Sequence, residues 1–412
     1  MKINGQDKII LRDLAKEVAE IASHPDMAQR RQRWVEHNSL RSTEPMMLIF
    51  PEGAWEELLP TSTLRCGDLQ AREIEWSLRS RIYTFTHFQD DTVIEAEWIE
   101  NAVVQDTGWG LDDIREESSA ARGAYRIEPA LKQFSDLKKM HFPELVYDEP
   151  AIQTRLTMQR DLFGDILTVR PKGVSRIAYG LTSQYLFLRG ETALLMDMVD
   201  APGFIHEVMA FLVEGHRRFL KQLVEANLLS LNNDSTYHSS GGNGYTDELP
   251  GPGFDPQRVR PCDMWASAQS QEMQPVSPKM HCEFVQQYEK QLLEPFGLTG
   301  YGCCEDLTRK MDYVFTLPGI RRISCSPFAN VDVCAEKLKG NYIFSWKPQP
   351  ADLVGAFNPE HIREYVHHTL EVTQANHCVF EMILKDTHTV EYHPERMDEW
   401  TRIARQSINE IQ

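Results

Sequence analysis

The sequence predicts an α/β protein built as a closed (β/α)8 TIM barrel, and three observations support this class. Eight apolar runs of strand length are spread along the 412 residues. Helical patterns lie between several of these runs, and alternation of strands and helices is typical of a parallel sheet. Sulfur-bearing and charged side chains follow several runs directly, which is where such a barrel carries its active site. We therefore expect one barrel with a site at the carboxyl ends of its strands.

Bulk composition fits this class and excludes others. The chain is 42% hydrophobic and 25% charged, as in ordinary globular proteins. Its formal net charge of −18 would repel phosphate backbones and anionic membrane surfaces, so neither nucleic acid nor a membrane is an expected partner. The polar N-terminus does not resemble a signal peptide, and no run approaches the roughly 18 apolar residues of a membrane span. Eight cysteines are too few for a disulfide scaffold of this length, so we expect a reducing, cytoplasmic compartment.

Residues 1–44 are expected to form a helical extension in front of the barrel. Leucine, valine and isoleucine recur at helical spacing between residues 6 and 37. The barrel itself would occupy residues 45–412 and would begin with a buried apolar strand at 46–50.

An insertion after the first strand is expected at about 51–164, over one face of the barrel. It is predicted to be helical at 68–87 and 127–163 and extended at 92–105. The loop at 237–256 is rich in glycine and is predicted to be a flexible lid or pocket loop. The seven further strands are predicted at 165–169, 228–233, 263–269, 298–304, 321–325, 342–346 and 378–384.

Polar and sulfur-bearing side chains stand at or just after the ends of these strands. Those considered are Glu52, Asn233, Asp234, Gln269, Cys303, Cys304, Glu305, Cys325, Lys347, Lys385, Asp386 and His388. Thiolate, imidazole and carboxylate are the ligands that zinc prefers, and a catalytic zinc takes three of them. Adjacent residues of a strand point to opposite faces, so the sequence leaves open which of Cys303 and Cys304 faces the site. Cys325 with Glu272 is the alternative location, although a single cysteine is more often a small packing residue.

Five segments carry a resemblance to a known family. They are VSPKMHCEFVQQYEKQLLEPFGL, YGCCED, RRISCSP, YIFSWKPQP and ILKDTHTV. On these motifs the chain resembles the uroporphyrinogen decarboxylase superfamily and, within it, the corrinoid-dependent zinc methyltransferases. The resemblance covers most of the chain from Pro45 onward and implies a (β/α)8 barrel.

The motifs depart from the family pattern at two places. Zinc methyltransferases of this superfamily carry His-x-Cys after the fifth strand and a cysteine after the eighth. Here Cys303 matches the first cysteine, Tyr301 stands at the histidine position, and His388 lies near the place of the last cysteine. The true decarboxylases have arginines after the first strand, whereas residues 51–55 contain none, so the carboxylates of a porphyrinogen would lack partners.

The resemblance implies a methyltransferase that acts with zinc. It would move a methyl group between a small O-methylated, or other heteroatom-methylated, substrate and the cobalamin of a separate corrinoid protein. The metal ligands would come from Cys303, Cys304, Glu305 and His388. Asp386 and Lys385 would be the catalytic residues that orient ligand and substrate. The substrate pocket would contain Glu52, Trp55, Asn233, Asp234, Gln269 and Lys347.

Two other readings of the chain stay open. One is a metal-free lyase of the decarboxylase type, which would use Asp234 or Glu52 as the acid and Lys347 as the cation. The other is a non-catalytic barrel that binds a corrinoid protein. The sequence leaves open the methyl donor, the direction of transfer and whether the chain forms a homodimer.

Overall fold

The centre of the protein is a parallel sheet of seven strands. The computed structural model describes residues 3–111, 114–116 and 126–411. The strands are hydrogen-bonded in the order β1-β13-β12-β11-β10-β9-β8, and every ladder is parallel. Their bounds are β1 (Met46–Ile49), β8 (Ala178–Tyr179), β9 (Trp265–Ala268), β10 (Leu298–Tyr301), β11 (Ile320–Cys325), β12 (Ile343–Trp346) and β13 (Val379–Leu384). The predicted α/β class is confirmed, whereas no ladder within the described ranges joins β1 to β8 to close a barrel.

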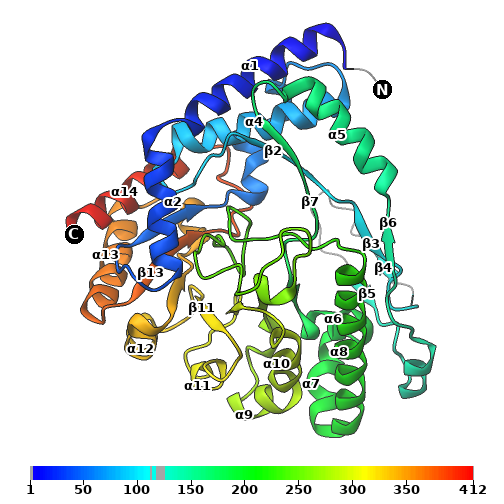
Figure 1. Ribbon diagram of the computed structural model, residues 1–412. Coiled ribbons are helices and arrows are strands. Elements are labelled where there is room, and N and C mark those ends of the chain that lie inside the picture. The colour runs from blue at the N-terminus through cyan, green and yellow to red at the C-terminus, as the bar shows by residue number, and fades with distance from the viewer. Residues whose placement is uncertain (1–2, 112–113, 117–125, 412) are drawn as a thin grey trace.

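Helices surround the central strands (Figure 1). The longer ones are α1 (Gly5–Ala22), α2 (Pro25–Asn38), α4 (Leu69–His87), α5 (Glu149–Phe163), α6 (Leu181–Arg189), α7 (Glu191–Asp200), α8 (Pro202–Glu225), α12 (Val331–Leu338), α13 (Pro359–Ala375) and α14 (Glu395–Ile411). The shorter ones are α3 (Trp55–Leu58), α9 (Pro278–His281), α10 (Gln287–Leu293) and α11 (Met311–Val314). Three pairs of short strands lie outside the central sheet: β2 (Glu97–Asn101) with β7 (Thr168–Lys172), β3 (Val104–Asp106) with β6 (Leu145–Tyr147), and β4 (Ile114–Glu116) with β5 (Arg126–Glu128).

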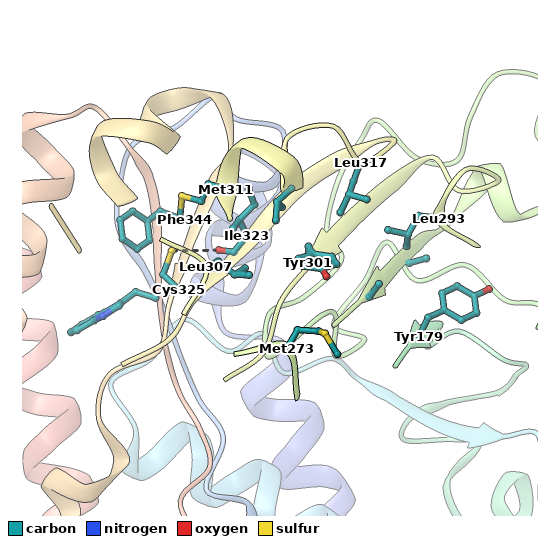
Figure 2. Packing of buried hydrophobic residues seen from close by; sticks show 14 of the residues in the cluster. Tyr179, Met273, Leu293, Tyr301, Leu307, Met311, Leu317, Ile323, Cys325 and Phe344 are labelled. Carbon is teal, nitrogen blue, oxygen red and sulfur yellow. Dashed lines mark hydrogen bonds between the residues drawn. The ribbon is translucent and has the colours of Figure 1, made fainter. Parts of the chain in front are cut away.

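Successive residues of the central strands alternate between two environments. Tyr301, Ile323 and Phe344 point toward the helices and belong to the largest hydrophobic core (Figure 2). The residues that alternate with them point to the inner face of the sheet and include fully buried polar groups such as Arg322 and Glu381. Buried polar groups are costly unless they are paired, so the inner face must satisfy its own charges.

Arg322 organises this polar inner face. Its guanidinium donates to both carboxylate oxygens of Glu381, at 2.8 and 3.1 Å. It also donates to His238 Nδ1 at 2.8 Å and to Asn38 Oδ1 at 2.6 Å. Burial alone would raise the pKa of Glu381, but the Arg322 charge holds that pKa far below its usual value. The pair therefore joins β11 and β13 to α2 and to the loop at 237–246.

The loop at 237–246 fills the space in front of the inner face. A Cβ at Gly241 would lie 2.6 Å from Ile383 Cγ2, and one at Gly242 would lie 2.8 Å from Arg322 Cζ. Gly241 also has a φ of +97°, which residues with a side chain rarely adopt. Glycine is therefore required where the loop backbone touches the strands.

Asp90 and Asp91, rather than another strand, bond to the second edge of β1, and the Asp91 N–H donates to the Met47 carbonyl at 2.8 Å. Asp91 Oδ2 accepts from the Met47 N–H at 2.8 Å, and Asp90 Oδ2 accepts from the Ile49 N–H at 3.1 Å. Burial raises the pKa of Asp90 to about 6. Arg33 pairs with Asp91 at 2.8 Å and compensates its charge. These carboxylates satisfy the backbone groups that a neighbouring strand would otherwise bond.

Two expectations about the first half of the sheet are wrong. The strand expected at 165–169 is displaced to β7, which pairs with β2 outside the central sheet. The strand expected at 228–233 forms a single bridge, between Leu229 and Val174, before the chain turns toward the inner face. The segment expected at 237–256 to be a flexible lid or pocket loop is a loop, but it is packed over its first ten residues, of which eight are buried.

The N-terminal and insertion segments follow the predicted pattern in part. Helices occupy 5–22 and 25–38 before β1, and α4 lies within one residue of its predicted range. The segment predicted helical at 127–163 holds only one full helix, α5, together with a 3-10 turn at Phe134–Lys139 and β6. Part of the expected insertion, at 112–113 and 117–125, lies outside the described residues.

The loop at 237–246 is called the inner loop. Replacing Gly241 with alanine tests how closely this loop packs. The Gly241→Ala variant should lose about 1–3 kcal/mol of unfolding free energy more than Gly253→Ala, because the new methyl group overpacks the contact with β13. Gly253 is the matched control, since its φ is +73° but nothing lies within 4 Å of an added Cβ. Urea unfolding followed by circular dichroism measures both losses. Equal losses would mean that backbone strain alone matters and that the loop does not pack tightly.

Candidate functional site

The candidate site lies where β10 and β13 end. Cys303 and Cys304 follow β10, and their sulfur atoms lie 3.6 Å apart. The Cys304 sulfur lies 3.7 Å from Asp386 Oδ2, on the loop after β13. Parallel strands bring their carboxyl ends to one edge of a sheet, so residues far apart in the sequence meet there. Both cysteines therefore reach the same site, which strand alternation alone left open.

A lysine and two carboxylates adjoin the cysteine pair. Lys385 Nζ donates to both carboxylate oxygens of Asp386, at 3.0 and 2.9 Å. The Asp386 N–H donates to Glu52 Oε2 at 3.0 Å, which links the loop after β13 to the end of β1. Asp386 and Glu52 have φ values of +58° and +49°, which cost a non-glycine residue roughly 1–3 kcal/mol each. Backbone strain of this kind clusters at functional sites.

The two thiols differ in acidity. A hydrogen bond with Cys304 lowers the pKa of Cys303 below that of an ordinary thiol; burial opposes this effect, while the Lys385 charge lowers the pKa further. The same hydrogen bond raises the pKa of Cys304. Burial would lower the pKa of Lys385, but Cys303, Tyr237 and Asp386 together raise it. The site therefore favours a thiolate beside an ammonium group.

The inner loop contributes one wall of the site. Ser240 Oγ donates to Cys303 Sγ at 3.4 Å. The Tyr237 ring packs edge-on against Phe50, with centroids 5.0 Å apart, and Arg176 Cζ lies 4.6 Å from the centroid of the Tyr237 ring. Sequence reasoning missed Ser240, Tyr237 and Arg176. The glycines that follow Ser240 were the available signal, because they permit close backbone approach.

Glu305 holds the backbone of the loop that carries Cys303 and Cys304. It is buried, and its carboxylate accepts from the Cys303 N–H at 2.8 Å and from the Ser270 N–H at 3.2 Å. Ser270 Oγ and the Tyr301 hydroxyl both donate to Glu289, at 2.5 and 2.7 Å. Burial raises the pKa of Glu305 and raises that of Glu289 to about 8. This network fixes the loop backbone, so Glu305 acts on Cys303 through its N–H group.

Three of the other predicted residues lie at or near strand ends. Lys347 Nζ is buried and donates to Ser345 Oγ at 2.6 Å, and burial lowers the Lys347 pKa to about 8. Gln269 is half-buried directly after β9. His388 is exposed, and its backbone lies against Gly53. The loop after β13 thus brings Asp386, rather than His388, to the cysteine sulfurs.

Three predicted pocket residues are engaged elsewhere. Trp55 packs edge-on against an α4 tryptophan, with ring centroids 5.7 Å apart. Asn233 Nδ2 donates to a backbone carbonyl at 2.9 Å. Asp234 forms an ion pair with Lys172 at 2.6 Å. The predicted place of Asn233 and Asp234 depended on a strand at 228–233, which forms only a single bridge.

Cys325 and Glu272, the alternative location of the metal site, are also engaged in other contacts. Cys325 is fully buried in the hydrophobic core and lies near Phe344 in Figure 2. Glu272 accepts from the hydroxyl groups of Thr182 and Ser183, at 2.5 and 2.6 Å. Cys325 is therefore a packing residue.

The predicted ligand set does not come together as a metal centre. In the described part of the chain, no group of three or more His, Cys, Asp or Glu side chains is arranged to hold a metal ion. Glu305 is taken up by backbone N–H groups, and His388 is exposed. Cys303 and Cys304 are the two predicted ligands that do meet, and Asp386 is the carboxylate next to them.

Comparison with known proteins gives no assignment. No family model matches the chain, and no curated protein matches it. Among the helices that the structure describes, none is both long and apolar enough to cross a membrane. A functional conclusion therefore depends on the sheet and on the chemistry at its carboxyl edge.

The lowered pKa of Cys303 predicts a thiol that reacts at unusually low pH. Only the thiolate is nucleophilic, so in metal-free protein the alkylation rate of Cys303 should have a pH midpoint below the ~8.5 of a free cysteine. Lys385→Met removes a charge that favours the thiolate, so the midpoint should rise and the rate at neutral pH should fall. Peptide mass spectrometry after iodoacetamide treatment measures the rate, with the exposed Cys262 as internal control. The same midpoint in both proteins would contradict a role for Lys385.

Proposed function

We propose that this protein is a zinc-dependent methyltransferase. It would move a methyl group between a small O-methylated, or other heteroatom-methylated, substrate and the cobalamin of a separate corrinoid protein. The observation that carries the proposal is the pair of cysteine sulfurs 3.6 Å apart at the carboxyl edge of a parallel sheet, with Lys385 and Asp386 beside them. The resemblance of YGCCED and ILKDTHTV to the corrinoid-dependent zinc methyltransferases supports the same class.

The proposal includes a closed (β/α)8 barrel of the uroporphyrinogen decarboxylase superfamily. Two features of the strand order support it. The first strand, β1, pairs with the last, β13, and the other neighbours follow one another in chain order. A doubly wound open sheet would instead reverse its strand order at a switch point. The bridge between Val174 and Leu229 lies where the remaining barrel strands would pair.

The cysteine pair fits part of a zinc site. Two sulfurs that each lie about 2.3 Å from a tetrahedral zinc are about 3.8 Å apart, close to the observed separation. A carboxylate oxygen in the same coordination shell would lie about 3.6 Å from a sulfur, and Asp386 Oδ2 is 3.7 Å from Cys304 Sγ. The Lys385 ammonium group already forms an ion pair with Asp386. Asp386 therefore becomes a third ligand only if the metal replaces this ammonium group.

The chain's own residues then have distinct roles. Cys303 and Cys304 would bind the metal, and Asp386 would complete three protein ligands. The metal would supply Lewis acidity toward the heteroatom that carries or receives the methyl group. Lys385, released from Asp386, would stabilise negative charge that develops on this heteroatom. Glu52 holds the Asp386 backbone, as its hydrogen bond to the Asp386 N–H indicates.

Zinc binding should depend on both cysteines. Cys303→Ser and Cys304→Ser each remove a ligand, so each should weaken zinc binding by more than the roughly 10–100-fold that changes around a metal site cost. Cys262→Ser changes an exposed cysteine outside the site and should leave affinity unchanged. Competition with a chromophoric chelator measures affinity, and circular dichroism checks folding. Wild-type affinity in both site variants would place any zinc elsewhere.

Methyl transfer is tested with free reduced cobalamin as the acceptor and a panel of methyl ethers, thioethers and methylamines. The wild-type protein should methylate the cobalamin with at least one donor, and its absorption spectrum reports the change. The Cys303→Ser variant should be slower by at least ~100-fold, because the metal and the thiolate are lost together. Release of carbon dioxide from carboxylated members of the panel, without cobalamin methylation, would instead favour the lyase alternative.

A further inference from the structure

Cys303 and Cys304 are neighbours in the chain, and oxidants can reach them. Cys304 is exposed, Cys303 is partly exposed, and their sulfurs lie 3.6 Å apart. A disulfide bond is about 2.05 Å long, so the sulfurs must approach by about 1.6 Å, which rotation of the side chains can supply. Among the described cysteines, Cys325 and Cys334 also interact with each other, but both are fully buried.

We propose that Cys303 and Cys304 form a reversible disulfide with each other when the protein meets a hydroperoxide. The modification would join two adjacent residues at the carboxyl edge of the sheet. Once the disulfide has formed, neither sulfur would be free to bind a metal ion or a substrate at the site. The cysteine pair would then be an oxidation-sensitive site, which is a property of the thiols themselves and does not require a bound metal.

The oxidation proceeds in two balanced steps. The Cys303 thiolate attacks one oxygen of hydrogen peroxide, the O–O bond breaks, and the sulfur becomes a sulfenic acid while hydroxide leaves and takes up a proton. The Cys304 sulfur then attacks the Cys303 sulfur, the S–S bond forms, and the S–O bond breaks. The departing hydroxide takes the proton of the Cys304 thiol and leaves as water. Two thiols and one peroxide thus yield one disulfide and two waters.

The surroundings of Cys303 favour the first step. The Ser240 hydroxyl donates to the Cys303 sulfur at 3.4 Å. A hydrogen bond to sulfur stabilises negative charge on it and so favours the nucleophilic form. Cys304 is exposed beside Cys303 and serves as the resolving cysteine.

The resulting disulfide would be strained and easily reduced. Neighbouring Cα atoms are about 3.8 Å apart across a trans peptide, shorter than the roughly 4.4–6.8 Å of ordinary disulfides. Backbone movement is restricted, because Glu305 accepts from the Cys303 N–H at 2.8 Å and Ser324 Oγ donates to the Cys303 carbonyl at 3.0 Å. Strained and exposed disulfides are the labile ones, so low-molecular-weight thiols should reverse this one.

One tryptic peptide reports the modification directly. Cleavage after Lys290 and Arg309 gives residues 291–309, which contain Cys303 and Cys304 and no other cysteine. Full-length, reduced, zinc-free protein is treated with hydrogen peroxide, alkylated with iodoacetamide and digested without reductant. The peptide should carry no alkyl group and should be lighter than its dithiol form by two hydrogen atoms. Treatment with dithiothreitol before alkylation should restore the doubly alkylated peptide.

Two controls make the result specific. Cys304→Ser leaves one thiol in the peptide, so the loss of two hydrogens should disappear and Cys303 should gain oxygen instead. Cys262 is an exposed cysteine outside the pair and should stay alkylatable for longer than the pair does. The proposal is overturned if the wild-type peptide only gains oxygen atoms, or if Cys262 is oxidised before the pair. The experiment contains no zinc, so a peptide that forms no disulfide contradicts only the oxidation proposal. If the disulfide forms but the protein does not bind zinc, only the proposed methyltransferase function is contradicted.

Discussion

A buried ion pair between Arg322 and Glu381 holds the inner face of the sheet together. Both side chains are fully buried, and two N–H···O contacts at 2.8 and 3.1 Å join them. Removing one partner of such a pair commonly costs about 3–5 kcal/mol, because the other charge is left buried and uncompensated. Ser345, His238 and Asn38 add hydrogen bonds, so three strands, α2 and the inner loop meet at one cluster.

The position of the candidate site follows from this cluster. The inner loop is held at His238 and continues to Ser240, whose hydroxyl reaches the Cys303 sulfur. On β13, side chains point to the same face at every second residue, so Lys385 stands on the same side as Glu381, at the carboxyl end of the strand. The ion pair therefore fixes the loop and the strand that place a hydroxyl and an ammonium around one thiol.

The sequence predicts the second half of the fold better than the first, for physical reasons. Strands β9 to β13 are short apolar runs with turns or helices between them, and this pattern is local. β8 has only two residues, and the segment at 228–233 gives way to a loop held by side-chain contacts, which leave no period in the sequence. The cysteine pair was recognisable from its chemistry. The sequence does not predict that Asp386, rather than His388, lies beside the cysteine sulfurs, because this placement depends on the left-handed backbone conformation at Asp386.

X-ray absorption at the zinc edge tests most directly whether Cys303 and Cys304 form one metal-binding thiolate pair. The measurement uses full-length protein loaded with one equivalent of zinc and reports the ligand atoms themselves. We expect two sulfur ligands at about 2.3 Å, with oxygen or nitrogen ligands at about 2.0–2.2 Å completing the shell. A coordination shell with no sulfur, or with only one, would contradict a zinc centre built on the adjacent cysteines.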